Sequence, residues 1–205
     1  MILLINNYPR KEDLHKIGMI KKALLILGKC EVLVWSFSEI DEQLLPQNIE
    51  AVILSGANKH LNKPKHIAVY QSEIEFVRKV NVPLLGICFG HQLIGIAFGS
   101  RLYSTPDYIK NFQNVKILQP NEILSSWKEG DNVTVYQYHK DCLSELPEGF
   151  VCLAESQSCN IEAMKHRTRP IYGIQAHIER ATTENPHGLQ ILRNFVENVV
   201  ETCEL

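Results

Sequence analysis

The sequence lacks the features of several broad protein classes. It has no long run of like charges, and 21 Lys and Arg residues against 23 Asp and Glu residues leave a net charge of −2. A surface for nucleic acid or for an anionic membrane is therefore not expected. No apolar stretch approaches the roughly 20 residues of a membrane-spanning helix, and no basic leader precedes the first apolar run. We accordingly expect neither a membrane anchor nor a signal peptide, and a cytoplasmic location.

Paired cysteines are missing as well. The six cysteines, at positions 30, 88, 142, 152, 159 and 203, include no Cys-x-x-Cys pair. This favours free thiols over a disulfide framework, and no spacing of ligand residues suggests a metal site. No internal repeat, low-complexity stretch or linker divides the chain, and 205 residues at 45% hydrophobic content can bury one full-sized core. We expect one domain over residues 1–205.

In the first half of the chain, short apolar runs alternate with segments of helical period. Strands are expected at residues 2–6, 31–35, 51–54 and 82–87. The apolar spacing indicates helices over 17–27, closed by Gly28, over 67–80, and over 92–98, ended by Gly99. Parallel strands need such crossover helices. The alternation therefore predicts an α/β fold with a flavodoxin-like, doubly wound, mostly parallel sheet that has helices on both faces.

The second half of the chain has a different pattern. Strands are expected at residues 115–118, 133–138, 150–154, 161–165 and 171–175. Their short connections favour antiparallel hairpins, so we expect additional antiparallel strands in the C-terminal half. A closing amphipathic helix is indicated by apolar residues that run from Leu189 to Cys203.

One segment carries a specific chemical signal. Residues 86–92 read Gly-Ile-Cys-Phe-Gly-His-Gln and join an expected strand to an expected helix. This is the layout of a nucleophile elbow, the tight turn that projects a central nucleophile, with cysteine in place of serine. The helix N-terminus beneath Cys88 favours its thiolate. A buried structural cysteine between two turn glycines is the alternative, whereas the other five cysteines are expected to be ordinary thiols.

A thiolate nucleophile needs a general base with an orienting partner. Among eight histidines, His177 ends an apolar strand and is followed two positions later by Glu179. In an extended segment these two side chains point to the same side, which predicts a Cys88-His177-Glu179 triad. His91 is expected to be structural, and no role is assigned to His139 and His166. Surface positions are expected for the remaining histidines, which are His15, His60, His66 and His187.

A tetrahedral intermediate also needs an oxyanion hole, usually built from backbone N–H groups. One donor is expected from Phe89, the residue after the nucleophile. A second is expected from the loop at residues 55–58, Ser-Gly-Ala-Asn, which follows the strand next to the elbow strand.

Residues 86–92 together with residues 175–179, Gln-Ala-His-Ile-Glu, resemble the paired signature of the class I (triad) glutamine amidotransferases. The resemblance spans essentially the whole chain. Segments 138–141, 146–150, 161–166 and 169–175 resemble the amidotransferase part of GMP synthases, in particular the free-standing archaeal-type glutaminase subunit. The resemblance implies a chain that hydrolyses L-glutamine to glutamate and ammonia and passes the ammonia to a separate ATP-pyrophosphatase (synthetase) subunit for the amination of XMP.

The resemblance also implies roles for individual residues. Cys88 would be the nucleophile, His177 the base and acid, and Glu179 its orienter. Gly56 and Phe89 would form the oxyanion hole. Substrate contacts are implied for Gln92, His139 and Asp141, the last two in a segment that faces the synthetase in GMP synthases. The chain has no Ser-Gly-Gly-x-Asp-Ser loop, so no cofactor is expected here, and ATP and Mg would bind to the partner only.

Several positions depart from the family pattern. Ala57 replaces a glycine of Ser-Gly-Gly-Pro, and a positive φ there would distort the oxyanion hole. Ala176 and Ile178 replace an aromatic residue and a proline, and residues 6–10 replace the usual N-terminal loop. Arg180 is expected to form a salt bridge with Glu179.

Three other functions fit the same residues. They are an amidotransferase for another acceptor, such as an anthranilate-type enzyme, a hydrolase of γ-glutamyl peptides, and a non-catalytic regulatory module of the same fold.

Overall fold

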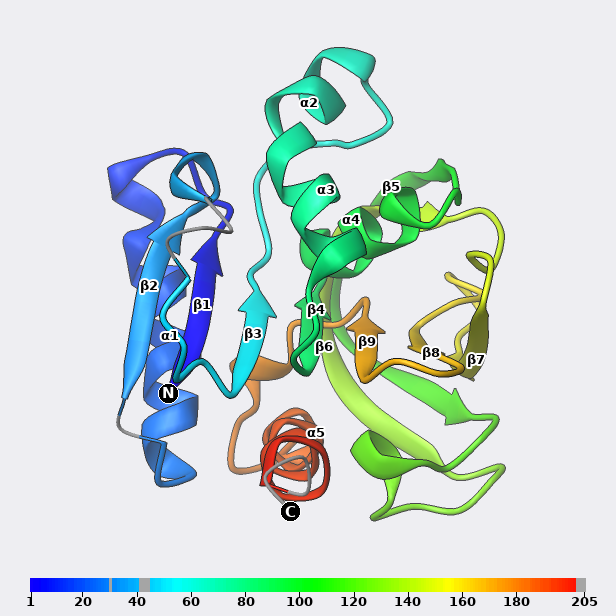
Figure 1. The fold of residues 1–205 in the computed structure, drawn as a ribbon. Coiled ribbons are helices and arrows are strands. Elements are labelled where there is room, and N and C mark those ends of the chain that lie inside the picture. Colours follow the sequence, from blue (N-terminus) through cyan, green and yellow to red (C-terminus); the bar gives the residue numbers. More distant parts are fainter. Residues whose placement is uncertain (30, 41–44, 202–205) are drawn as a thin grey trace.

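The computed structural model of the protein describes residues 1–29, 31–40 and 45–201. Within them, nine strands form one sheet in the order β2-β1-β3-β4-β9-β8-β7-β5-β6 (Figure 1). The strands are β1 (Ile2–Asn6), β2 (Val32–Ser36), β3 (Ala51–Leu54), β4 (Leu84–Ile87), β5 (Leu102–Ile117), β6 (Asn132–Leu143), β7 (Phe150–Glu155), β8 (Ala163–His166) and β9 (Ile171–Ile174).

The helices alternate with the strands in the first half and close the chain at its end. The α-helices are α1 (Leu14–Ile26), α2 (Pro64–Val69), α3 (Gln71–Lys79), α4 (Phe89–Ala97) and α5 (His187–Phe195), and α5 continues as a π-helical turn, η6 (Val196–Val200). Short 3-10 turns are η1 (Lys11–Asp13), η2 (Phe37–Glu39), η4 (Glu122–Leu124) and η5 (Ile178–Arg180). Cys203, at the end of the expected closing helix, lies outside the described residues.

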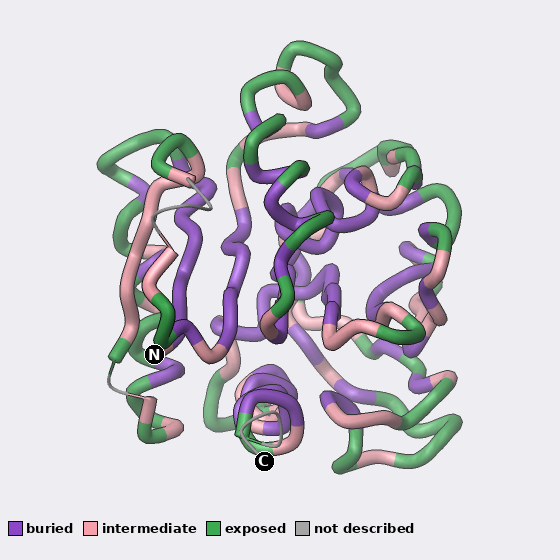
Figure 2. Tube along the Cα trace, in the orientation of Figure 1, coloured by how far each residue is buried: buried purple, intermediate pink, exposed green. Residues whose placement is uncertain are grey.

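Five strands make the parallel half of the sheet. The neighbours β2-β1-β3-β4-β9 are all parallel, which is the strand order of the flavodoxin-like fold. Strands β1, β3, β4 and β9 are buried along their whole length, and Figure 2 shows them as the purple centre of the molecule. Burial on both faces explains why their sequences are continuous apolar runs.

Each face of this half has its own hydrophobic core. Leu24 of α1 and Leu192 of α5 pack with Leu4 of β1 on one face. On the other face, Val77 of α3 and Leu93 of α4 pack with Leu3 of β1. Helices therefore cover both faces, and the predicted doubly wound fold is confirmed.

The C-terminal half is antiparallel, as predicted, but its main hairpin is longer than expected. Strands β8 and β7 continue the sheet antiparallel to β9, and β5 pairs with both β7 and β6. Strand β5 begins at Leu102, whereas the sequence predicts a strand only from residue 115. The prediction missed the first part because most of the first twelve residues are exposed and polar and form no apolar run. The hairpin returns to the parallel half, where the His177 amide donates to the Tyr136 carbonyl over 2.8 Å.

The helix expected over residues 67–80 is divided in two. Helix α2 ends at Val69 and α3 begins at Gln71, with Tyr70 between them at φ −104° and ψ 18°. The buried Tyr70 hydroxyl donates to the Asn7 carbonyl over 2.9 Å, and its ring lies 4.7 Å from that of Phe89. These long-range contacts bend the chain at a position where the sequence indicates one continuous helix.

No helix in the described ranges is long and apolar enough to cross a membrane.

Candidate active site

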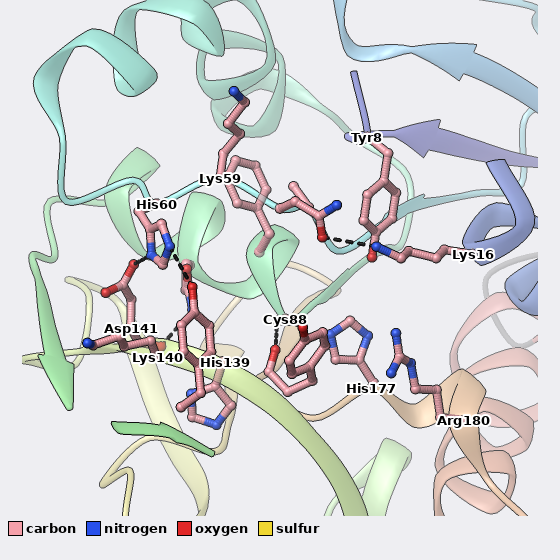
Figure 3. A pocket seen from close by; sticks show the side chains of 16 residues that line it. Tyr8, Lys16, Lys59, His60, Cys88, His139, Lys140, Asp141, His177 and Arg180 are labelled. Atoms are coloured by element: carbon pink, nitrogen blue, oxygen red, sulfur yellow. Dashed lines mark hydrogen bonds and ion pairs between the residues drawn. The ribbon is translucent and has the colours of Figure 1, made fainter. Parts of the chain in front are cut away.

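A cavity of about 270 Å³ opens where β1, β3, β4 and β9 end (Figure 3). In open α/β sheets, ligands bind outside the carboxyl ends of the strands. This space, called the Cys88 cavity below, takes residues from the loops after all four strands and from the β5–β6 hairpin. Its lining includes Tyr8, Lys16, Ala57, Asn58, Lys59, His60, Cys88, Phe89, Gln92, Tyr108, Tyr138, His139, Lys140, Asp141, His177 and Arg180.

Cys88 lies on a sharp turn between β4 and α4. Its φ of 51° and ψ of −101° make it the one non-glycine residue with a positive φ in the described part of the chain. The turn needs both flanking glycines. A Cβ at Gly86 would come within 2.5 Å of the Gly90 backbone, and a Cβ at Gly90 within 2.6 Å of the Leu54 carbonyl oxygen. The steric demands of a nucleophile elbow are therefore present.

Cys88 is buried, with only 5% of the residue exposed. Its backbone N–H donates to the Ile174 carbonyl over 2.8 Å, which ties the elbow to the end of β9. The Gln175 amide nitrogen lies 3.6 Å from the sulfur, and the Tyr138 carbonyl oxygen 3.9 Å from it. The thiol is therefore placed at the end of the cavity where β4, β9 and β6 meet.

His177 lies next to Cys88 and is bound to Glu179. Figure 3 shows the Cys88 and His177 side chains adjacent, and the imidazole Nδ1 lies 2.7 Å from Glu179 Oε1. Burial alone would lower the pKa of His177, but the charge of Glu179 and the charge and hydrogen bond of Cys88 outweigh it and raise the pKa to about 10. The geometry favours an imidazolium between a thiol sulfur and a carboxylate.

The local reason for this contact differs from the prediction. Glu179 belongs to the 3-10 turn η5 and not to an extended segment. The expected salt bridge of Arg180 with Glu179 is also wrong. The Arg180 guanidinium lies 5.2 Å from the Tyr136 ring centre and 5.4 Å from that of Tyr138, where cation–π attraction holds it. Glu179 is therefore left to His177.

The loop after β3 borders the same site. A Cβ at Gly56 would lie 2.8 Å from His177 Cε1 and 2.8 Å from the Tyr8 hydroxyl, so the Gly56 backbone packs directly against the imidazole. Ala57 has no positive φ, and the expected distortion at this position does not occur. Phe89 opens α4 directly after the elbow. Both backbone segments that were expected to supply the oxyanion hole therefore border the cavity.

Comparisons with known proteins agree with this geometry. Residues 15–199 match the family model "Glutamine amidotransferase class-I". The glutamine-hydrolysing GMP synthase subunit of Methanosarcina mazei is 41% identical over 204 residues, with 100% of this chain and 97% of the relative covered. The corresponding protein of Methanosarcina barkeri is 35% identical over 196 residues, at 96% and 95% coverage.

This chain belongs to the class-I glutamine amidotransferases. Two crystal structures share its fold. One is a Thermoplasma acidophilum protein with a TM-score of 0.83 and 24% identity over 99% of this chain and 95% of that one. The other is a glutamine amidotransferase of Thermotoga maritima, with a TM-score of 0.79 and 16% identity over 98% and 97%.

The predicted substrate contacts of the amidotransferase all border the Cys88 cavity. The Gln92 amide nitrogen donates to the Asp141 carbonyl over 2.7 Å and to Gln175 Oε1 over 3.1 Å. The His139 Nδ1 lies 3.8 Å from the Cys142 sulfur. The carboxylate of Asp141 is already occupied by side chains of the protein, because His60 and Ser104 both bind to it.

His60 is a site residue for which the sequence pattern predicts a surface position. It lines the cavity, and its Nδ1 lies 2.7 Å from Asp141 Oδ2. Tyr8 was also missed. Burial and the nearby charges of Glu179 and Cys88 raise the pKa of its hydroxyl. Neither residue belongs to a recognisable sequence motif. Their place at the site depends on contacts between segments that are distant in the sequence, the β5–β6 hairpin and the loop after β1, and these are known only from the structure.

His91 and Cys142 are buried side chains outside the proposed triad. His91 is fully buried, and burial lowers its pKa to about 3, which agrees with a structural role. A hydrogen bond with Cys159 and another with His139 lower the pKa of the Cys142 thiol, against the opposing effect of burial. Cys30 and Cys203 lie outside the described residues.

Proposed function

We propose that this amidotransferase hydrolyses L-glutamine to glutamate and ammonia through Cys88, His177 and Glu179. The observation that carries the proposal is the elbow at Cys88, which presents a thiol beside an imidazole that is bound to a buried carboxylate. A sulfur nucleophile, a base and an orienting group are then assembled in one cavity.

In the first half of the reaction, the Cys88 thiolate attacks the carboxamide carbon of glutamine. The tetrahedral oxyanion would be stabilised by the N–H groups of Phe89 and of the loop at Gly56. His177, as an imidazolium, donates its proton to the departing nitrogen, and ammonia leaves. A glutamyl thioester on Cys88 remains.

In the second half, neutral His177 removes a proton from water, and the hydroxide attacks the thioester carbon. Collapse of this intermediate breaks the carbon–sulfur bond, returns the thiolate and releases glutamate. Glu179 keeps the imidazole oriented and stabilises its charged form in both halves. Gln92, His139 and Asp141 would bound the space in which the glutamine backbone lies.

The acceptor of the ammonia follows from the relatives. Proteins that match nearly the whole chain at 35% and 41% identity are named as the glutamine-hydrolysing part of GMP synthase. We therefore infer that the ammonia passes to a separate synthetase subunit that binds ATP and Mg and aminates XMP, and that the pair works in the cytoplasm.

Reconstitution with the candidate synthetase subunit tests this function. Glutamate and GMP are measured with glutamine, XMP and ATP, and the two products are expected in equal amounts. Cys88→Ala should abolish glutamine-dependent GMP formation and retain formation from added ammonium salt. Cys152→Ala serves as a matched control, because Cys152 lies in β7 and does not line the cavity.

Other outcomes would identify the alternatives. Full glutaminase activity in Cys88→Ala would refute the triad. Hydrolysis of γ-glutamyl peptides without hydrolysis of glutamine would indicate a peptide hydrolase. If a γ-electrophilic glutamine analogue fails to alkylate Cys88 even with the partner present, the chain is a non-catalytic module.

A further inference from the structure

A chain of hydrogen bonds lies at one end of the Cys88 cavity, away from His177 (Figure 3). His60 Nδ1 lies 2.7 Å from Asp141 Oδ2, and His60 Nε2 lies 2.9 Å from the Tyr108 hydroxyl. We propose that His60, Asp141 and Tyr108, called the latch below, position the loop that carries Gly56. This inference rests on the proposed function and adds positioning residues to it.

The latch has a buried inner end and an exposed outer end. The Asp141 side chain is 3% exposed, the His60 side chain 31%, and Tyr108 is 54% exposed. The second oxygen of the Asp141 carboxylate accepts from Ser104 over 2.6 Å and from Asn62 over 3.3 Å. A buried carboxylate with three partners is a firm attachment point.

The Gly56 loop is attached at both of its ends. At its start, Ser55 Oγ accepts the Asn7 backbone N–H over 2.9 Å, and the Asn7 amide donates to the Ser55 carbonyl over 3.1 Å. At its far end, His60 and Asn62 bind to Asp141. Gly56 lies between these attachments.

The attachments at the two ends hold the loop to different halves of the fold, and Asn58 between them binds to Asp13 over 2.9 Å and to Lys16 over 3.0 Å. Asn7 directly follows β1 in the parallel half, whereas Asp141 belongs to β6 in the antiparallel half. The Asp141 carbonyl also accepts from Gln92 of α4, the helix that begins at the elbow. The latch therefore fixes the Gly56 backbone relative to the wall that carries Cys88, and Figure 3 shows His60 and Asp141 at the opposite end of the cavity from Tyr8 and Arg180.

This connection predicts a kinetic signature. An oxyanion-hole donor acts on charge that develops in the transition state, so its displacement lowers kcat more than it raises KM. Misplacement by about 1 Å can cost on the order of a hundredfold in rate. Loss of the latch should therefore lower kcat and leave the triad itself intact.

The test compares three substitutions of His60 and its partner in the complete two-subunit enzyme. His60→Ala removes the latch, and we expect kcat for glutamine hydrolysis to fall by about tenfold or more with a smaller change in KM. His60→Asn places an amide nitrogen near the position of Nδ1, keeps the bond to Asp141, and should recover most of that loss. Tyr108→Phe keeps the inner bond and should have the smallest effect.

His15→Ala is the matched control. His15 is exposed at the start of α1 and does not line the cavity, so its removal should leave kcat and KM unchanged. The latch is refuted if His60→Ala keeps kcat within about twofold of the wild type, or if His60→Asn loses as much activity as His60→Ala while both variants remain folded.

Hydrogen–deuterium exchange separates the latch from the glutaminase proposal. Peptides that cover residues 55–63 should exchange faster in His60→Ala than in the wild type and in His60→Asn, whatever the enzyme hydrolyses. Unchanged exchange overturns the latch. A wild-type enzyme without glutaminase activity overturns the proposed function, and faster exchange in His60→Ala would still support the positioning of the loop.

Discussion

Cys88 has a strained backbone conformation, and the tightly packed residues around it hold the backbone in that conformation. A positive φ at a residue with a side chain costs on the order of 1–3 kcal/mol, and the close approaches at Gly86 and Gly90 hold the chain in that turn. The motif could be recognised from the sequence because the glycines flank the nucleophile directly. The contact of His177 with Glu179 was also predicted, although through the wrong backbone geometry.

The pH dependence of glutamine hydrolysis should follow His177. Its pKa is raised to about 10, so the imidazolium is retained through neutral pH, and its stabilising interactions are lost only as the pH rises through about 10. We expect kcat/KM to fall near pH 10, where the imidazolium that protonates the departing nitrogen is lost.

Glu179→Gln removes the charge that raises this pKa. The alkaline fall of kcat/KM should then move to lower pH, with a lower maximal rate. The ammonia-dependent rate of the Cys88→Ala complex, measured over the same range, corrects for titration of the partner. An alkaline limb that stays in place in Glu179→Gln would contradict the assignment.

Neighbouring positions in the Gly56 loop should differ in their sensitivity to a methyl group. Gly56→Ala places a Cβ within 2.8 Å of the His177 ring and the Tyr8 hydroxyl, so one of these groups must move. We expect kcat to fall by about tenfold or more. Ala57→Gly should leave the rate nearly unchanged, because Ala57 has no positive φ to relieve. Glutamate release by the two variants measures the difference, and a higher rate in Ala57→Gly would show a strained loop.

At the scale of elements, the sequence predicts those strands and helices that are determined by residues close together in the chain. Strands β1, β3 and β9 and helices α1 and α4 follow from apolar runs and terminal glycines. The break at Tyr70 and the length of β5 do not, because a distant hydrogen bond to Asn7 and pairing with β6 determine them. His60 was placed at the surface for the same reason, since its role depends on Asp141, 81 positions away.

Helix α3 contains a carboxyl group that should make stability depend on pH. Glu73 is completely buried, and burial raises its pKa to about 8 against the opposing effect of the Asn7 amide. A carboxyl group with a raised pKa favours the folded state below its ordinary pKa of 4.5, and this advantage is lost as the pH rises through about 8.

The matched substitution for this group is Glu73→Gln. The variant should be more stable than the wild type at pH 9, by on the order of 5 kcal/mol at full ionisation, and the difference should shrink towards pH 5. Urea unfolding across this pH range measures it. Parallel pH profiles of the two proteins would show that Glu73 does not titrate in the folded state.

At the scale of the whole molecule, charge is distributed unevenly. The net charge is only −2, yet the Cys88 cavity is bordered by the cationic side chains of Lys59, Lys140 and Arg180, and by Lys16, which is paired with Asp13 over 2.7 Å. The acidic side chains of this region are engaged, Asp141 by His60 and Glu179 by His177. A synthetase that takes up ammonia from this cavity must cover a positively charged mouth.

Such a surface predicts that salt slows association with the synthetase. Charges at an interface rim act mainly on the association rate, and salt screens them over about 8 Å at physiological ionic strength. Lys59→Glu should slow association and weaken its dependence on salt, whereas Lys21→Glu makes the same change in net charge on α1, away from the cavity. Association rates measured between low and high salt distinguish the two variants. Because their net charges are equal, a slower rate in Lys59→Glu alone locates the synthetase over the cavity, and equal rates would place its contact elsewhere.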